Sequence, residues 1–279
     1  MKQILYILFL LLSFSGFSQN TENITSEKYT AHNKGKFYIF WGGNRETYSK
    51  SDIHFTGNGY DFTINNVEAQ DKPKGWHVDY INPTRMTIPQ TNFRLGYFIT
   101  DKYNISIGVD HMKYVMYQDK TVNYTGYYDN PGSYNENPNA NQLTLHENFL
   151  TFEHTDGLNY INTEFSRVDD ISKYINLPNT DKFQVNLTEG IGAGILYPKT
   201  NAKLLGKERH DDFHVSGYGF SAKAGLNFTF FKYFFIQTEL KGGYINMNDI
   251  KTTFDAADKA TQKFWFLQKV IAVGGIFRI

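Results

Sequence analysis

The chain has 279 residues, and its 28 Lys and Arg balance its 28 Asp and Glu, so the formal net charge is zero. This balance argues against a nucleic-acid-binding protein, which normally carries a basic excess. The lack of cysteine excludes disulfide bridges, cysteine-ligated zinc and a lipid-modified cysteine anchor. Aromatic residues make up 17% of the chain, which is enough to bury a large core and argues against disorder.

The N-terminus has the layout of an export signal. Lys2 precedes a short apolar run, and small residues follow at Gly16 and Ser18. The run is shorter than the roughly 20 apolar residues that a membrane-spanning helix needs, so we expect cleavage after Ser18. The expected segments are a signal peptide over 1–18, a flexible lead-in over 19–35 and a single β-barrel domain over 36–279.

Alternation of apolar and polar residues with a period of two dominates the chain after Lys36. We expect eight strands, over 36–48, 91–99, 105–116, 158–167, 182–197, 213–229, 233–246 and 263–279. Short turns at one end alternate with long segments at the other, over 49–90, 117–157, 199–212 and 247–262. This connectivity is typical of an eight-stranded antiparallel transmembrane barrel with short periplasmic turns and long extracellular loops.

The composition of the two strand faces predicts which face meets lipid. In the segment 182–197, Phe183, Val185 and Ile191 share one face, whereas Gln, Asn, Thr and Gly occupy the other. A face in water would favour long Lys and Glu side chains, while small polar residues suit the crowded interior of a narrow barrel. We therefore expect the apolar rows to contact lipid. A soluble, lipocalin-like carrier with its apolar face inward is the alternative.

Two tight turns predict charge pairs inside the lumen. A tight turn near residues 101–103 places Arg94 opposite Asp110, on the face away from lipid. The hairpin around Phe231 places Lys223 opposite Glu239 by the same reasoning. Such pairs neutralise each other and hydrogen-bond across strands, so we interpret them as structural rather than catalytic.

The last strand has an apolar row that stops at Ile279, with Phe277 two positions earlier. This end resembles the C-terminal strand of bacterial outer-membrane proteins, whose final residue is usually aromatic. The segments 109–116, 152–162 and 217–244 resemble, in this order, a family of outer-membrane β-barrel proteins from Bacteroidota. The resemblance implies the fold and a location in the bacterial outer membrane, and it supplies no activity.

One triplet has catalytic residue types. His214-Val215-Ser216 resembles the His-x-Ser of lipid A deacylases, in which the histidine would act as general base and the serine as nucleophile. We place the triplet on the apolar face. No carboxylate is suitably placed to orient the histidine, because Glu239 lies on the other face and Glu189 lies far along its strand. A polar pair near the surface end of the strand is therefore the interpretation we favour.

A second polar cluster contains imidazole and carboxylate groups, which are ligands for divalent metals. Its members are Asp110, His111, Glu153, His154 and Asp156. Their spacing matches no standard metal motif, and neighbouring strand residues point to opposite faces. We expect neither a metal site nor a cofactor.

The segment 124–141 is rich in Tyr and Asn, which bind sugars or proteins by stacking and hydrogen bonding. The candidate binding residues are Tyr124, Tyr127, Tyr128 and Tyr134. A solvated barrel loop is the interpretation that we favour for this segment.

The expected function is a structural or surface-interaction role of the long loops, above a lumen that side chains fill. The alternatives are a lipid A-modifying hydrolase at His214 and Ser216, and the passage of small hydrophobic molecules through a lateral opening. An enzymatic activity is the interpretation that we favour less. The expected partners are outer-membrane lipid and a surface ligand or protein at the loops, without nucleic acid, and we expect a monomer.

Overall fold

The computed structural model describes residues 32–75, 77, 79, 89–177, 180–210 and 212–279. The predicted signal peptide over 1–18 and the lead-in as far as residue 31 lie outside the described residues. No helix among the described residues is long and apolar enough to cross a membrane.

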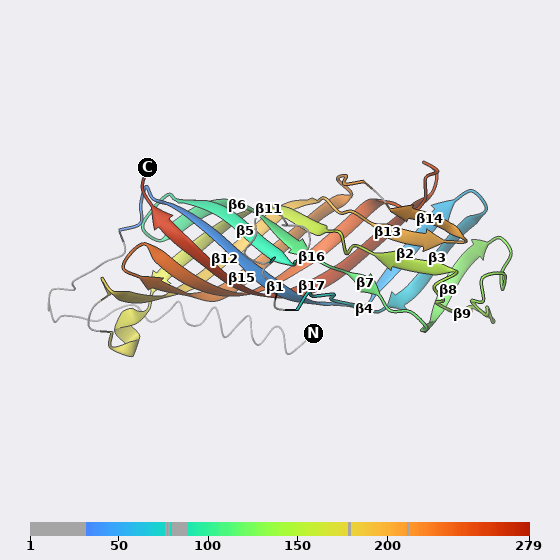
Figure 1. Cartoon of the computed structure of the whole chain (residues 1–279), viewed down its shortest axis with the longest axis horizontal. Helices are drawn as coiled ribbons and strands as arrows, with labels where there is room; N and C mark the ends of the chain where they lie inside the picture. The colour runs from blue at the N-terminus through green and yellow to red at the C-terminus, as the bar shows by residue number, and fades with distance from the viewer. Residues whose placement is uncertain (1–31, 76, 78, 80–88, 178–179, 211) are drawn as a thin grey trace. The chain divides into compact units, whose positions relative to one another are not determined.

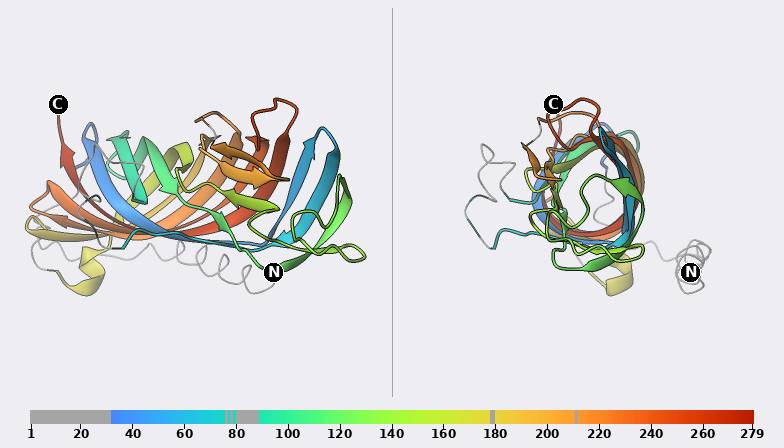
Figure 2. Two further views of the ribbon diagram at one scale, coloured as in Figure 1. Left: turned by 45° about the vertical axis from the view of Figure 1, so that its right-hand side comes forward. Right: turned by 90° about the vertical axis from the view of Figure 1, so that its right-hand side faces the viewer.

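Eight antiparallel strands form a closed ring, which is seen from the side in Figure 1 and end-on in Figure 2. In ring order they are β1 (Phe37–Tyr48), β5 (Thr91–Phe98), β6 (Tyr103–Met112), β11 (Leu158–Asp170), β12 (Phe183–Leu196), β15 (Gly217–Phe230), β16 (Phe234–Lys251) and β17 (Lys259–Phe277). β17 pairs again with β1 and closes the ring. The predicted eight-stranded antiparallel barrel is confirmed, and each predicted strand corresponds to one strand of the ring.

The strands of the ring are staggered. We can move around the ring from each residue to its cross-strand partner, starting at Phe37 of β1. This path returns to β1 at Thr47 rather than at Phe37. The residues between these two points are Tyr97, Ile105, Phe165, Ile191, Ala222, Gly242 and Leu267. Such a stagger requires strands that tilt against the barrel axis, and eight tilted strands enclose a space that side chains fill.

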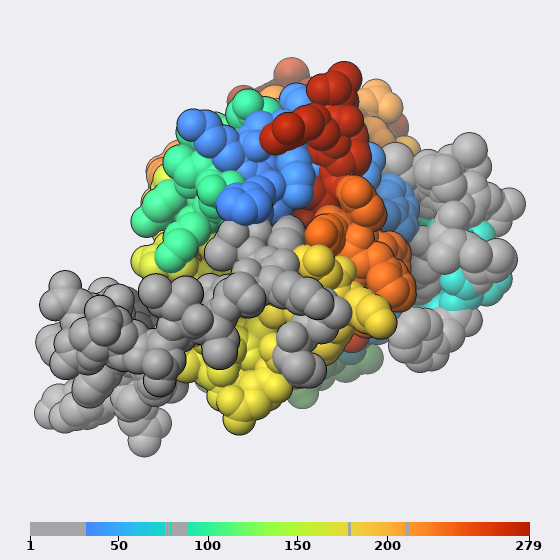
Figure 3. Space-filling view, turned by 90° about the vertical axis from the view of Figure 1, so that its left-hand side faces the viewer, coloured from blue at the N-terminus to red at the C-terminus, as the bar shows by residue number. Residues whose placement is uncertain are grey.

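Short connections lie at one end of the ring, which we call the turn end. β15 and β16 are joined through Phe231 and Lys232, which both have positive φ angles, of 52° and 72°. β11 and β12 are joined through the short helix η4 (Ser172–Ile175). Phe37 and Phe277 are cross-strand partners at this end, and Figure 3 shows the blue β1 and the red β17 side by side there.

At the opposite end the long connections form further strands, which together we call the head (Figure 1). β2 (Ser51–Gly57), β3 (Tyr60–Val67), β8 (Thr121–Tyr128) and β9 (Gln142–Thr144) extend the sheet of the ring from β17. A second sheet consists of β14 (Lys207–His210), β13 (Asn201–Leu204), β10 (Leu150–Glu153), β7 (Val115–Met116) and β4 (Ala69–Gln70).

The head corrects two expectations. The segment 117–157 is not simply a solvated loop, because it contains β8, β9 and β10. The expected long loop over 247–262 is also wrong. β16 and β17 stay paired as far as Lys251 and Lys259, beyond a bulge between Met247 and Ile250. In both segments the backbone remains hydrogen-bonded to neighbouring strands, although the polar composition of the segments indicates loops. This backbone pairing is the physical reason for both corrections.

The face of the strands that carries apolar side chains changes along the barrel. In the ring, large apolar side chains such as Ile107, Ile191 and Ile271 point outward and are exposed, as predicted. In the head, apolar side chains point inward and form one large buried cluster, which includes Phe55, Phe62, Phe149, Phe152 and Phe264. A smaller apolar cluster at the turn end contains Tyr38, Phe40, Phe98, Phe235, Val270, Ala272 and Ile276.

Candidate functional site

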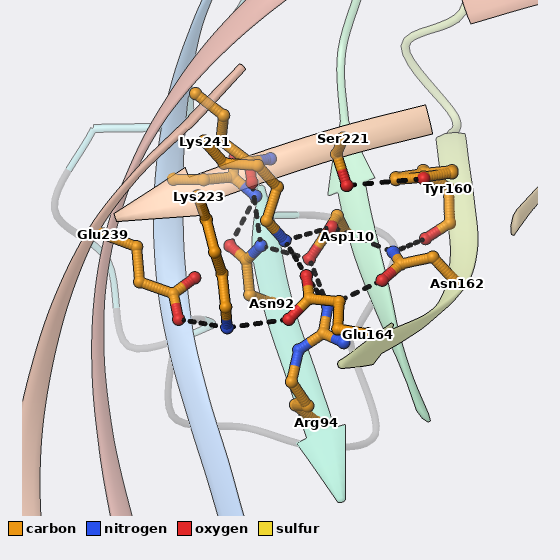
Figure 4. A network of polar contacts seen from close by, with 12 residues as sticks. Asn92, Arg94, Asp110, Tyr160, Asn162, Glu164, Ser221, Lys223, Glu239 and Lys241 are labelled. Carbon is orange, nitrogen blue, oxygen red and sulfur yellow. Dashed lines mark hydrogen bonds and ion pairs between the residues drawn. The ribbon is translucent and has the colours of Figure 1, made fainter. Parts of the chain in front are cut away.

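Six buried charged side chains, three of each sign, are joined by ion pairs in the middle of the lumen, and we call this set the lumen network (Figure 4). They project inward from five strands of the ring, and the members are Arg94, Asp110, Glu164, Lys223, Glu239 and Lys241. Each of them occupies an inward position in the period-two alternation of its strand, which is why the network lies on the side away from lipid.

Glu164 is the centre of the network. Its Oε1 lies 3.0 Å from Arg94 Nη2 and 2.8 Å from Lys241 Nζ, and its Oε2 lies 2.7 Å from Lys223 Nζ. One carboxylate therefore contacts all three cations of the network. Figure 4 shows these cations converging on Glu164 from different strands.

The other two carboxylates complete the ion pairs. Lys223 Nζ lies 2.8 Å from Glu239 Oε1. Lys241 Nζ lies 2.7 Å from Asp110 Oδ2. Each cation thus lies between carboxylates, and the buried charges of the network balance.

Neutral amides satisfy further carboxylate oxygens. Asn92 donates to Asp110 Oδ1 at 2.6 Å, and Asn162 donates to Asp110 Oδ2 at 3.0 Å. Gln237 donates to Glu239 Oε1 at 2.9 Å. Buried ions that are paired and hydrogen-bonded hold their side chains in one geometry, so the network fixes the relative positions of strands across the lumen.

The predicted register of both hairpins is wrong by two residues. Arg94 is the cross-strand partner of Gly108, and Asn92 faces Asp110. In the other hairpin Lys223 faces Lys241 rather than Glu239. The centre of each turn lies one residue away from the assumed position, which moves the partner by two.

A shift of two residues keeps every side chain on its face, so both predicted ion pairs still form, along diagonals. Arg94 Nη2 lies 3.5 Å from Asp110 Oδ1, and Lys223 contacts Glu239 as described. Sequence reasoning missed Glu164 and Lys241 in the network. The period-two alternation of their strands indicated that both side chains point into the lumen. It did not indicate which side chains they contact across the lumen.

The His214 and Ser216 pair does not form a catalytic arrangement. β15 begins at Gly217, so Ser216 precedes the strand, and its side chain is buried rather than facing lipid as expected. The backbone carbonyl of Ser216 accepts hydrogen bonds from the backbone N–H groups of Asn248 and Asp249, within the bulge of β16. Ser216 Oγ has no hydrogen-bond partner among the described residues, while His214 Nε2 lies 2.8 Å from the carbonyl oxygen of Asp249.

The second polar cluster is dispersed in the structure. His111 Nδ1 lies 2.7 Å from Asn159 Oδ1, and His154 Nδ1 lies 2.9 Å from Thr200 Oγ1. Asp110 belongs to the lumen network instead. In the described parts of the chain, no three His, Asp or Glu side chains come together in a group that could hold a metal ion.

The four candidate tyrosines have different environments. Tyr128 is buried, and its ring centroid lies 5.3 Å from those of Phe62 and Phe149. Tyr124 and Tyr134 are half-buried and pack against the apolar cluster of the head. Tyr127, at 62% exposure, presents its ring to solvent.

A closed eight-stranded ring with an apolar outer wall and a polar, filled interior is the architecture of an outer-membrane-type β-barrel. No protein-family profile matches the chain, and no curated protein matches it. Among solved structures, the chain is similar in fold to OprG from Pseudomonas aeruginosa, with 9% identity, 89% of this chain and 99% of that chain covered, and a TM-score of 0.38.

Two further solved structures of outer-membrane proteins are similar in fold. For AlkL in lipid bilayers the identity is 8%, 94% of this chain and 98% of that chain are covered, and the TM-score is 0.40. For Neisserial surface protein A the identity is 11%, 88% of this chain and 100% of that chain are covered, and the TM-score is 0.30.

Proposed function

We propose that the protein is a surface-interaction barrel of the bacterial outer membrane. The ring anchors the chain in the membrane, and the head presents a binding surface outside the cell. The resemblance of the sequence to a family from Bacteroidota makes that origin part of the proposal.

The closure of the lumen carries this proposal. Apolar clusters fill the lumen in the head and at the turn end, and the charge-balanced network occupies the space between them. A lumen that is filled along its length leaves the outer surfaces of the protein as its working surfaces.

The surface of the ring supports the location. Its outward side chains form an apolar band, with aromatic residues such as Tyr244 and Trp265 toward the head and Phe37 and Phe277 at the turn end. Aromatic residues that border an apolar band are typical of a barrel wall that crosses a membrane.

The head has exposed aromatic side chains above a rigid apolar core. Tyr127 is 62% exposed and Phe254 is 79% exposed, although neither lies on the apolar band of the ring. Large aromatic side chains that a fold leaves in water, on a well-packed base, favour binding of a partner by stacking and burial.

The test is surface display of the protein on a bacterial host, followed by binding of the cells to arrays of polysaccharides and purified proteins. We expect wild-type cells to bind at least one array component, and Tyr127→Ser with Phe254→Ser to lower that signal about tenfold. Tyr174→Ser is the matched control, because Tyr174 is 71% exposed at the turn end.

Two outcomes would contradict the proposal. Displayed wild-type protein that binds nothing beyond the empty host would exclude the interaction role for the arrayed chemistries. Recovery of the mature chain in the aqueous periplasmic fraction, with the same gel mobility before and after boiling, would exclude the membrane barrel.

A further inference from the structure

The two ends of the segment that joins β4 to β5 meet at β1. Asp71 begins this segment and Gln90 ends it. The backbone N–H of Glu46 on β1 donates to Asp71 Oδ2 at 3.0 Å, and the backbone N–H of Asn44 donates to the carbonyl oxygen of Gln90 at 3.3 Å. The fold therefore brings Glu46, Asp71 and Gln90 together where the pairing of β1 with β5 ends, next to Gly43.

Two carboxylates share one neutral donor at this place. The side-chain amide of Gln90 donates through Nε2 to Glu46 Oε2 and to Asp71 Oδ1. Glu46 Oε1 also accepts from Gln268 Nε2 at 2.9 Å. Among the described residues neither carboxylate forms an ion pair, and Lys113 acts on Asp71 only from beyond ion-pair distance. Two like charges therefore face each other, and only neutral groups contact both of them.

Burial makes this arrangement costly. Glu46 is 5% exposed, and Gln90 is fully buried. Two carboxylates that share a buried site cannot both stay ionised unless a positive charge compensates them. Asp71 is half-buried and is followed by the exposed Lys72, so the pair is within reach of ions from solution. A cation from the surrounding water can therefore supply the compensation.

The same place holds two buried amide oxygens that accept no hydrogen bond from the described residues. They are Gln90 Oε1 and Asn44 Oδ1, and both side chains are at most 2% exposed. A buried acceptor without a donor costs free energy. A half-turn of the Gln90 amide about its last bond exchanges Nε2 for Oε1, so that an oxygen then faces both carboxylates. That orientation is favourable when a cation lies among the three oxygens.

We propose that Glu46, Asp71 and Gln90 bind one Ca²⁺ ion, with water completing its coordination. Carboxylate and amide oxygens are the ligands that Ca²⁺ takes, and its flexible geometry suits ligands from a strand and from two ends of a connection. The ion links the first and last residues of the segment 71–90 to β1. With only two charged ligands, we expect a dissociation constant of about 0.1–1 mM. The inference goes beyond the proposed function, because Ca²⁺ binding does not depend on which partner the head contacts.

The test measures thermal unfolding of the purified full-length barrel, refolded in a zwitterionic detergent so that no anionic lipid is present. We expect about 10 mM Ca²⁺ to raise the midpoint by about 3–10 °C over a sample with chelator, because an ion that binds only the folded state stabilises it by mass action. K⁺ at the same ionic strength should not reproduce the shift, because it only screens charge. A wild type that does not respond to Ca²⁺, or that responds equally to K⁺, would overturn the inference.

Asp71→Asn removes one ligand charge and should abolish the Ca²⁺ shift. Asp52→Asn is the matched control, because Asp52 is an exposed carboxylate of the head that accepts a backbone N–H, from Asn66 at 2.8 Å, as Asp71 does from Glu46. This control should keep the full shift. Each variant is run on a gel before and after boiling, so that a folded barrel is recognised. Loss of the shift in both variants, or in neither, would overturn the assignment of the ligands.

Gln90→Glu distinguishes a bound cation from a proton that Glu46 and Asp71 share. It adds a third carboxylate, so we expect a lower unfolding midpoint than that of the wild type in chelator and at least tenfold tighter Ca²⁺ binding. The midpoint as a function of Ca²⁺ concentration measures both effects. Ca²⁺ binding by Gln90→Glu that is no tighter than that of the wild type would show that position 90 does not face the ion, against the inference.

Discussion

Glu164 is the residue on which the lumen network depends, because it alone contacts Arg94, Lys223 and Lys241. Glu164→Gln keeps the shape of the side chain but leaves one uncompensated positive charge in the lumen. We expect the free energy of unfolding to fall by about 3–5 kcal/mol, as it does when one partner of a buried ion pair is removed. Urea unfolding in detergent measures the change.

Glu189→Gln is the matched control for that substitution. Glu189 is on the outer wall, its side chain is 56% exposed, and it lies 4.0 Å from Arg167. An exposed pair of this kind contributes about 1 kcal/mol or less. Equal losses for the two variants would show that the network does not stabilise the barrel as proposed.

The burial of His154 predicts that the stability of the head depends on pH. Burial lowers the pKa of His154 from 6.5 to about 3. Between pH 6.5 and 3, His154 is therefore protonated in the unfolded chain but neutral in the folded head. The contribution of the buried, neutral His154 to the free energy of unfolding is complete above pH 6.5 and is lost as the pH falls. The decrease is about 1.4 kcal/mol per pH unit, or about 2 kcal/mol at pH 5.

The measurement compares the free energy of unfolding at pH 7.5 and pH 5 for the wild type and for His154→Gln. The glutamine can still hydrogen-bond to Thr200 but does not titrate. The variant should lose less stability between the two pH values than the wild type. The same loss in both proteins would mean that other groups govern the acid sensitivity.

The face on which a residue lies was predictable from the sequence, whereas its cross-strand partner was not. Period-two alternation identified the inward faces of Arg94, Asp110, Lys223 and Glu239 correctly, because the face depends only on parity. Register depends on where a turn is centred, and a one-residue error there moves every partner by two. Contacts across the lumen, such as those of Glu164, depend on the closure of the ring, which no local pattern encodes.

At the scale of the strands, the ring was predictable and most of the head was not. The ring strands are long and alternate over many residues, so their pattern is strong. Six strands of the head have only two to four residues, and β4 and β7 have two residues each. β4 and β7 pair with each other and β7 also pairs with β10, while in the other sheet of the head β2 pairs with the extended end of β17. Pairing of this kind is a tertiary effect that overrides local composition.

The packing of Phe62 on β3 predicts that the head can unfold while the ring stays folded. Phe62 is buried in the head, with ring centroids of Phe55 and Phe149 at 5.3 and 6.1 Å. Phe62→Ala should destabilise the head by about 3–5 kcal/mol, because it leaves a cavity among aromatic side chains. Limited proteolysis of intact cells should then cleave the head faster than in the wild type.

Tyr127→Ala controls for this substitution, since Tyr127 is exposed on the neighbouring β8 and should leave the cleavage rate unchanged. The gel mobility of unboiled Phe62→Ala should still be that of a folded barrel. A variant whose mobility no longer depends on boiling would show that head and ring unfold as one unit, against the expectation.

At the scale of the whole molecule, the order of the layers in the lumen determines what can pass through it. The apolar cluster at the turn end includes Tyr38 and Phe235, the charged layer follows, and the apolar cluster of the head closes the other side. Hydrated ions would need to displace packed aromatic side chains and then break paired charges. We therefore expect the purified barrel to show no steady conductance in planar bilayers, whereas a sixteen-stranded porin inserted in the same bilayers should conduct, because its wider lumen is aqueous. Insertion is checked independently by protease access to the head, and stable conductance steps from correctly inserted protein would contradict a closed lumen.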